Sequence, residues 1–301
     1  MTSLLNGIYH AKQDLLSIPP DLAISTTTVT MKVNVFFNVE NIGLYFDDFD
    51  NILIGKRYGN RVVNNLINIK KIKSDKKKKR KEKKNFYNQV SLIFRTCTLM
   101  GLDPTKITQK EGLKTVNVKL FINGSIQMTG CKHLENIKSS LELLFEKLKV
   151  TKVILNKNME YIEKPFVIDT TLLNINNVNN FYIQMINTNF NIQFHINRSK
   201  LFQLLLDNNI DASFDPIIHA CVNIKYYLSL KKTKTISIFV FESGSITIAG
   251  SNSCSEILEA YNFINKFILS NYSVLLTKDI TPNLIIEFIK KTNFNQNNIH
   301  F

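Results

Sequence analysis

Residues that could perform chemistry are few and poorly clustered in this sequence of 301 residues. The stretch 131–133 reads Cys-Lys-His, but no second pair of zinc ligands follows at a usable spacing. Asp47, Asp48 and Asp50 lack the glycine and the distal glutamate of a calcium loop. Glycine-rich phosphate loops, metalloprotease motifs and serine-hydrolase motifs are also missing from the sequence. The sequence therefore predicts a binding protein that is not an enzyme and has no metal, no cofactor and no small-molecule substrate.

Charge is the most uneven property of the chain. The formal net charge is +14, and residues 70–84 alone carry +9, from 11 basic and 2 acidic residues. Such a run repels itself and lacks apolar residues to pack, so we expect a solvated insertion. Two interpretations stay open: a solubilising or localisation segment, or an arm that binds polyanions by releasing counterions. The centre of this basic arm consists of Lys76, Lys77, Lys78, Lys79 and Arg80.

A duplicated motif gives the strongest signal. Residues 121–130 read FINGSIQMTG and residues 241–250 read FESGSITIAG, an offset of 120 residues at every matched position. Agreement at so many positions is improbable by chance, so the chain contains an internal repeat.

The flanks of both motifs predict the same elements. Residues 116–120 and 236–240 alternate apolar and other residues, which indicates strands, and Gly124 and Gly244 stand where a tight hairpin needs positive φ. An amphipathic helix follows each hairpin, and Ser253 with Glu256 forms a capping box before the second helix. Further strands are expected at 90–95 and 221–227. The unit of strand, hairpin and long helix, used twice, predicts an α+β fold with helices on one sheet face, and the bare face is a candidate binding surface.

This paired motif resembles the TATA-binding-protein family, most of all the divergent TATA-binding-protein-like factors of large DNA viruses. The resemblance covers roughly residues 20–270. It implies that two direct repeats form one curved antiparallel sheet, a saddle, with helices on the convex face. It also implies a transcription initiation factor that binds promoter DNA in the minor groove.

The resemblance also implies roles for individual residues. Phe121 and Phe241 match phenylalanines that the family inserts between base steps. The positions expected to face DNA or to contact phosphate are Asn123, Gln127, Thr129, Ser243, Thr247, Arg95 and Lys225. The implied partners are double-stranded AT-rich promoter DNA, a transcription factor IIB-like factor and RNA polymerase subunits, with no membrane.

The sequence departs from the family pattern at several of these places. The second inserted phenylalanine of each repeat is replaced, by Gln89 in the first and His219 in the second, and the groove contacts at Gln127 and Thr247 are polar. Minor-groove binding depends on apolar contact, so the losses predict weaker bending. The alternative function is therefore a saddle-fold protein scaffold with weak or no sequence-specific DNA binding.

Simpler interpretations exist for single residues. Phe121 and Phe241 could be core residues, but their alternation with Ile126 and Ile246 favours exposure on the opposite face if the turn has two residues. Arg95 and Lys225 could be ordinary solvated charges.

Five segments are expected along the chain. These are a leader (1–20), repeat one (21–150, with the insertion 70–84), a link (151–180), repeat two (181–275) and a C-terminal tail (276–301). Four scattered cysteines without CxxC spacing, no signal peptide and no membrane-spanning run predict a reducing intracellular location. If the protein is viral, as the resemblance implies, this location is the host nucleus or a cytoplasmic viral factory.

Overall fold

The computed structural model describes residues 3–47, 53–64, 86–95, 115–230 and 233–276. The chain divides into two compact units. Unit 1 comprises residues 1–10 and 28–182, and unit 2 comprises residues 11–27 and 183–301. Helix α1 (Leu4–Leu15) and strands β1 (Ala23–Val33) and β9 (Val178–Asn191) each contribute residues to both units. The basic arm lies outside the described residues.

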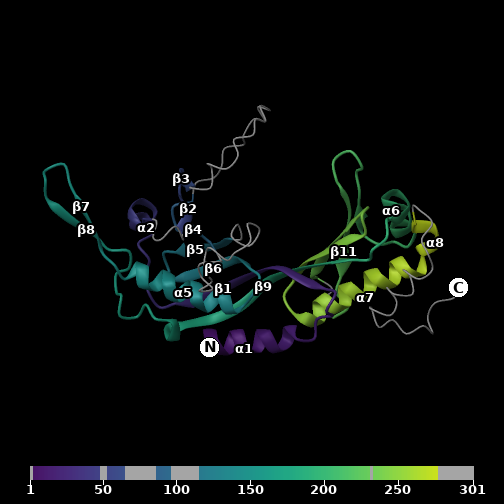
Figure 1. Cartoon of the computed structure of the whole chain (residues 1–301), viewed down its shortest axis with the longest axis horizontal. Helices are drawn as coiled ribbons and strands as arrows, with labels where there is room; N and C mark the ends of the chain where they lie inside the picture. The colour runs from purple at the N-terminus through teal and green to yellow at the C-terminus, as the bar shows by residue number, and fades with distance from the viewer. Residues whose placement is uncertain (1–2, 48–52, 65–85, 96–114, 231–232, 277–301) are drawn as a thin grey trace, which may run out of the picture. The chain divides into compact units, whose positions relative to one another are not determined.

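Unit 1 is a sheet with the strand order β1-β6-β5-β4-β2-β3. The pairs from β6 to β3 are antiparallel. Its strands, besides β1, are β2 (Leu53–Tyr58), β3 (Arg61–Asn64), β4 (Gln89–Arg95), β5 (Thr115–Phe121) and β6 (Ser125–Cys131). The long helix α5 (Glu135–Leu148) packs on β6, and the short α2 (Val39–Tyr45) packs on β2 and β4 (Figure 1).

Unit 2 repeats this plan with the antiparallel order β10-β11-β12-β13-β9. Its remaining strands are β10 (Ala212–Ser213), β11 (Cys221–Tyr227), β12 (Thr235–Phe241) and β13 (Ser245–Ser251). Its helices are α6 (Arg198–Asp207), α7 (Cys254–Ser270) and α8 (Tyr272–Leu275). The predicted α+β class, an antiparallel sheet with helices, is confirmed.

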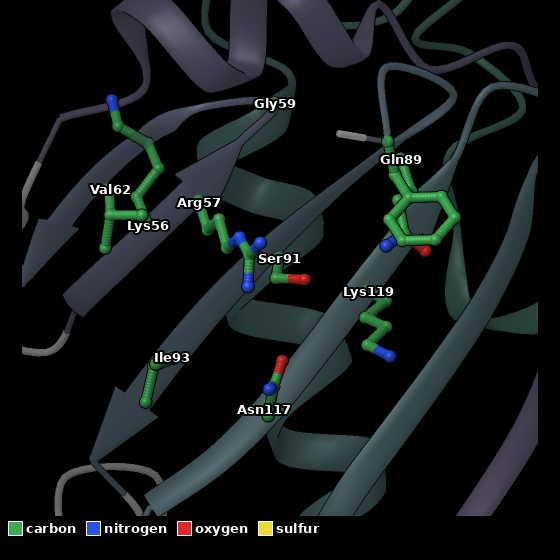
Figure 2. A pocket seen from close by; sticks show the side chains of 10 residues that line it. Lys56, Arg57, Gly59, Val62, Gln89, Ser91, Ile93, Asn117 and Lys119 are labelled. Atoms are coloured by element: carbon green, nitrogen blue, oxygen red, sulfur yellow. The ribbon is translucent and has the colours of Figure 1, made fainter. Parts of the chain in front are cut away.

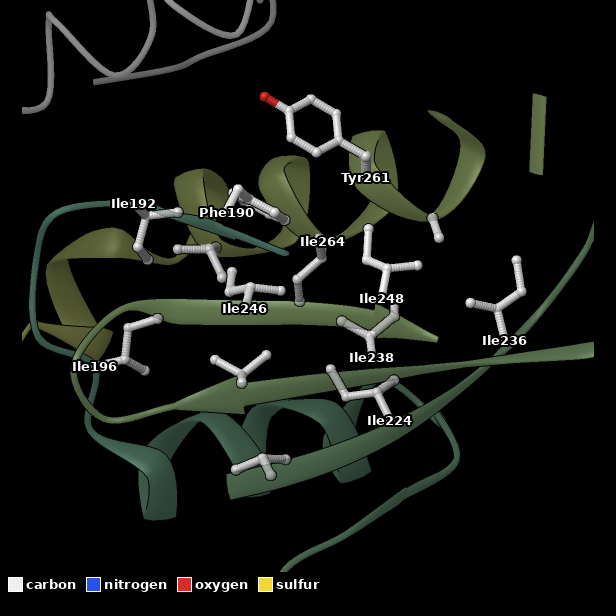
Figure 3. Packing of buried hydrophobic residues seen from close by; sticks show 14 of the residues in the cluster. Phe190, Ile192, Ile196, Ile224, Ile236, Ile238, Ile246, Ile248, Tyr261 and Ile264 are labelled. Atoms are coloured by element: carbon white, nitrogen blue, oxygen red, sulfur yellow. The ribbon is translucent and has the colours of Figure 1, made fainter. Parts of the chain in front are cut away.

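The cores follow from the alternation of the strands. Ile236, Ile238, Ile246 and Ile248 are fully buried, and they pack against Ile264 and its neighbours on α7 (Figure 3). Unit 1 buries Val116, Val118, Leu120, Ile126 and Met128 in the same way. Because side chains alternate along a strand, the residues between these positions point to the other face.

The hairpin turns are one residue longer than the sequence indicated, and each places its glycine at positive φ. The loop has three residues rather than two, since Leu120 pairs with Ile126 and the Gly124 amide donates to the Phe121 carbonyl at 3.0 Å. Gly124 has φ +81° and Gly244 has φ +78°, as a type I turn with a following bulge requires. A Cβ on Gly124 would lie 2.1 Å from the Val33 carbonyl oxygen, so no other residue fits there.

The structural repeat is longer than the sequence repeat. The amides of Val33, the last residue of β1, and of Ile192, the residue after β9, donate to the carbonyls of Gly124 and Gly244, each at 3.0 Å. In both units a helix follows, α2 and α6, and an asparagine caps it, because Asn38 and Asn197 accept the amide three residues on. These helices were not predicted. Ser253 caps α7 as predicted, since Glu256 donates its amide to the Ser253 hydroxyl at 3.4 Å, while the Glu256 carboxylate accepts from the Asn252 amide at 2.9 Å.

The segments outside the repeats contain their own structure. Residues 152–164 form a two-stranded hairpin of β7 (Lys152–Leu155) and β8 (Tyr161–Lys164), which stands out from unit 1 in Figure 1. The tail after residue 276 lies outside the described residues. No helix in the described part of the chain has the length and apolar character needed to cross a membrane.

Candidate nucleic-acid interface

Each unit has one sheet face to which none of the described helices contributes its core side chains. We call the side of β4, β5 and β6 that carries Phe121 face 1, and the corresponding side of β11, β12 and β13 that carries Phe241 face 2. Both phenylalanines are half-buried and lie on the side opposite the fully buried Ile126 and Ile246. The expectation that they are not core residues agrees with this placement, but the two-residue turn assumed for it is wrong: the three-residue loop pairs Leu120, not Phe121, with Ile126.

The other predicted positions gather on the same two faces. Gln127 and Thr129 lie on β6, and Thr247 lies on β13 in phase with them, all half-buried. Asn123 and Ser243 are exposed in the turns. Arg95 is half-buried at the end of β4, and Lys225 is exposed on β11.

The strand register defines which positions of the two repeats correspond. Gln89 pairs with Phe121, and Cys221 pairs with Phe241, so Cys221 corresponds to Gln89 and His219 lies outside the strand. Arg95 pairs with Thr115 and Tyr227 with Thr235, so Tyr227 corresponds to Arg95. Lys225 therefore faces the same way as Arg95 without occupying its position.

The end of face 2 is held by an arginine from α6. Arg198 forms a 2.8 Å ion pair with Glu242, the residue after Phe241, and donates to the Ala220 carbonyl at 2.8 Å. Its guanidinium also lies over the Phe214 ring, 5.4 Å from the centroid. Burial raises the pKa of the Cys221 thiol, and Arg198 opposes the shift only partly, so this thiol is uncharged at pH 7.

The described strands that build face 1, face 2 and their neighbours contain no carboxylates. Strands β1 to β6 and β9 to β13, as described, contain no aspartate or glutamate, although the chain has 24 acidic residues. The helices behind them do carry acids, such as Glu142 on α5 and Glu259 on α7. Strand residues on face 1 include the cations Arg57, Arg95 and Lys119, whereas face 2 has Lys225. Such a surface attracts polyanions and does not repel them at close range.

Both faces also carry amides without partners. The Oδ1 atoms of Asn117, Asn187 and Asn223 are buried and accept no hydrogen bond from the described residues. All three asparagines lie in phase with the faces, since Asn117 pairs with Thr129, Asn187 with Ala249 and Asn223 with Phe239. A buried unpaired polar atom costs about 1–3 kcal/mol. A ligand that covers the faces and supplies hydrogen-bonding groups would remove this cost.

Face 1 is hollowed at the side of β4 and β5 next to the β2–β3 hairpin. The hollow has a volume of about 450 Å³. Figure 2 shows Arg57, Ser91, Asn117 and Lys119 grouped around its floor. Lys56 is directed elsewhere, because its ammonium donates to the Phe46 carbonyl at 2.6 Å, and burial lowers its pKa.

Several of these residues escaped the sequence analysis for identifiable reasons. Asn117 and Lys119 alternate in phase with Phe121, and that signal could have found them. Asn187 on β9 and Arg57 on β2 gave no such signal. The face on which Asn187 lies depends on the register between β9 and β13, and no pattern in the sequence marks β2 as a strand.

The chain is similar to known proteins both in sequence and in fold. No protein-family profile matches the chain. A "TATA-box-binding protein-like" protein of Acanthamoeba polyphaga mimivirus is 30% identical over 280 residues, which cover 88% of this chain and 70% of that protein. Among solved structures, the Methanococcus jannaschii TBP matches with a TM-score of 0.45 and 14% identity, covering 83% of this chain and 98% of the other. The identity and coverage of the viral relative confirm the resemblance seen in the motifs, and the chain belongs to the TATA-box-binding protein-like family.

Proposed function

We propose that this protein is a TATA-binding-protein-like transcription initiation factor that binds duplex promoter DNA in the minor groove through faces 1 and 2. The observation that carries the proposal is the pair of corresponding sheet faces, each with a phenylalanine at the same register and no carboxylate in the described strands β1–β6 and β9–β13. Apolar side chains that enter a base step unstack it and bend the duplex. Phe121 and Phe241 are the residues for this role.

The remaining positions divide by what they would contact. Asn117, Gln127 and Asn223 present amides, which can donate to the adenine N3 and thymine O2 acceptors of the minor groove. Arg95 and Lys225 supply cations for phosphates and position the duplex without reading its sequence. The helices on the opposite side of each sheet remain available for a transcription factor IIB-like factor and RNA polymerase subunits.

The test replaces both phenylalanines by alanine. We expect Phe121→Ala with Phe241→Ala to abolish the preference for AT-rich over GC-rich duplexes and to remove DNA bending, because the bend, which costs several kcal/mol, would lose the contacts that offset it. Gel shifts on matched duplexes measure the preference, and energy transfer between dyes at the duplex ends measures the bend. The control replaces Tyr9 and Tyr161, aromatic side chains 59% and 82% exposed outside both faces, and should behave as wild type.

Two outcomes would contradict the proposal in different ways. If the double alanine variant bends AT-rich DNA as wild type does, the assignment of Phe121 and Phe241 is wrong. If the wild-type protein binds AT-rich and GC-rich duplexes equally and bends neither, the protein is a scaffold that has kept the fold and lost sequence-specific binding. The polar side chains at Gln127 and Thr247 are the feature that would favour this second function.

A further inference from the structure

We propose that the hollow in face 1 is a nucleotide-binding site, in which Arg57 and Lys119 hold a phosphate and Phe86 contacts the base. The site goes beyond duplex binding, because its ligand is a single nucleotide unit, either free or part of an unpaired strand. Its volume of about 450 Å³ lies within the range of small-molecule sites.

The charge of the lining selects an anion. Arg57 and Lys119 both line the hollow, and no carboxylate is among its lining residues. Neither cation has an ion-pair partner among the described residues, so their charges remain available to a ligand. Arginine and lysine together provide the fork and the point charge with which proteins bind phosphate.

The rest of the lining suits the base and sugar of a nucleotide. Phe86, which is 53% exposed, offers an aromatic surface for stacking. Gln89, Ser91 and Asn117 offer hydrogen-bonding groups, and the buried Oδ1 atom of Asn117 has no partner among the described residues. A phosphate, a flat aromatic ring and several polar edges are combined in a nucleotide.

The wall of the hollow is already ordered by side-chain packing before any ligand binds. Tyr87, the neighbour of Phe86, makes an edge-to-face contact with Tyr58 at 5.6 Å between ring centroids. Gly59 allows this contact, since a Cβ there would lie 2.4 Å from the Tyr87 ring. The Gly59–Asn60 turn and the chain before β4 are therefore held together around the hollow, which lowers the ordering cost of binding.

The corresponding strand positions of unit 2 do not repeat the two cations of the hollow. The register places Ser213 opposite Asn223, as Arg57 is opposite Ser91, and it places Phe239 where unit 1 has Lys119. Both cations of the hollow are thus absent from the second repeat. A requirement of the fold would be expected in both repeats. The two cations at these register positions are therefore specific to the first repeat and are not needed for folding.

The experiment measures binding of adenosine 5′-monophosphate, inorganic phosphate and a ten-residue oligo(dA) by calorimetry at low salt. Arg57→Gln with Lys119→Gln should weaken nucleotide binding at least tenfold. The control, Lys149→Gln with Lys200→Gln, removes the same charge from exposed helix-side positions and should retain wild-type binding. Phe86→Ala should weaken monophosphate binding about tenfold and leave inorganic phosphate unaffected. Circular dichroism establishes that each variant is folded.

The outcomes separate this site from the duplex surface. Binding of the monophosphate identifies a free nucleotide as a ligand, whereas binding of oligo(dA) alone identifies an unpaired strand; either supports the site if the hollow substitutions weaken it. Absence of binding to both probes, or binding that the hollow substitutions leave unchanged, would overturn it. AT-rich duplex binding, tested on the same samples with the Phe121 and Phe241 variant, reports on the proposed function independently.

Discussion

Single residues decide the geometry of face 1 and face 2 at the hairpin turns. Gly124 and Gly244 adopt positive φ and lie against the carbonyls of Val33 and Phe194, where side-chain atoms have no room. Each turn fixes the direction of the phenylalanine at the end of the preceding strand, Phe121 on β5 and Phe241 on β12. The backbone of the glycine thus determines where the phenylalanine points.

We expect Gly244→Ala to lower the free energy of unfolding by about 3 kcal/mol or more, because it combines a strained φ with a backbone overlap that cannot relax cheaply. The new Cβ would be 2.3 Å from the Phe194 carbonyl oxygen. Gly250→Ala is the control in the same hairpin: its φ is +101°, but the nearest atom is 3.7 Å away, so about 1 kcal/mol is expected. Urea unfolding measures both, and equal losses would contradict the overlap as the cause.

The sequence predicted the elements whose pattern is local. The alternation around Phe121 and Phe241 and the capping box at Ser253 located both hairpins and α7, because these signals act within a few residues. It missed α2 and α6, which are short and gain their stability from packing on the sheet rather than from a long apolar stripe. It also did not locate β9, Val178–Asn191, because the ends of this strand depend on partners far along the chain.

At the scale of elements, one carboxylate connects the end of β11 with α7. Glu259 on α7 accepts hydrogen bonds from the Ser229 hydroxyl at 2.6 Å, the Ser229 amide at 2.7 Å and the Tyr226 hydroxyl at 3.0 Å. The Ser229 side-chain bond is the main cause that lowers the pKa of Glu259 below its ordinary value of 4.5. The charged form is therefore the one that holds the helix to the sheet.

A lowered pKa in the folded state means that the carboxylate stabilises the fold above pH 4.5 and loses this contribution as the pH falls through the lowered pKa. We expect Glu259→Gln to be less stable than wild type by about 1 kcal/mol at pH 7, a modest value because the group is partly solvated. The difference should shrink as the pH falls below 4.5 and through the lowered pKa of Glu259. Glu142→Gln, which removes only an exposed pair with Lys138 at 3.6 Å, should cost less than about 0.5 kcal/mol. A difference that does not decrease as the pH is lowered from 7 to well below 4.5 would contradict the assignment.

At the scale of the whole molecule, most of the net charge and the surfaces proposed to contact bases belong to different parts of the chain. Residues 70–84 carry +9 of the net +14, while the strands of face 1 and face 2 supply phenylalanines, amides and a few cations. Phosphate contacts by the arm would be independent of sequence, and contacts by the faces would depend on it. The two contributions can therefore be removed one at a time.

Deletion of residues 70–84 should weaken binding to AT-rich and GC-rich duplexes by the same factor and reduce the slope of log K against log salt, because fewer counterions are released. Arg95→Gln should reduce that slope by about one, as expected for the loss of a single phosphate contact. Fluorescence anisotropy at several salt concentrations gives both slopes and the AT-to-GC ratio. If the deletion lowers the AT-to-GC affinity ratio instead of the salt slope, the basic arm takes part in sequence recognition. The proposal that the arm contacts phosphates and the sheet faces contact bases would then be wrong.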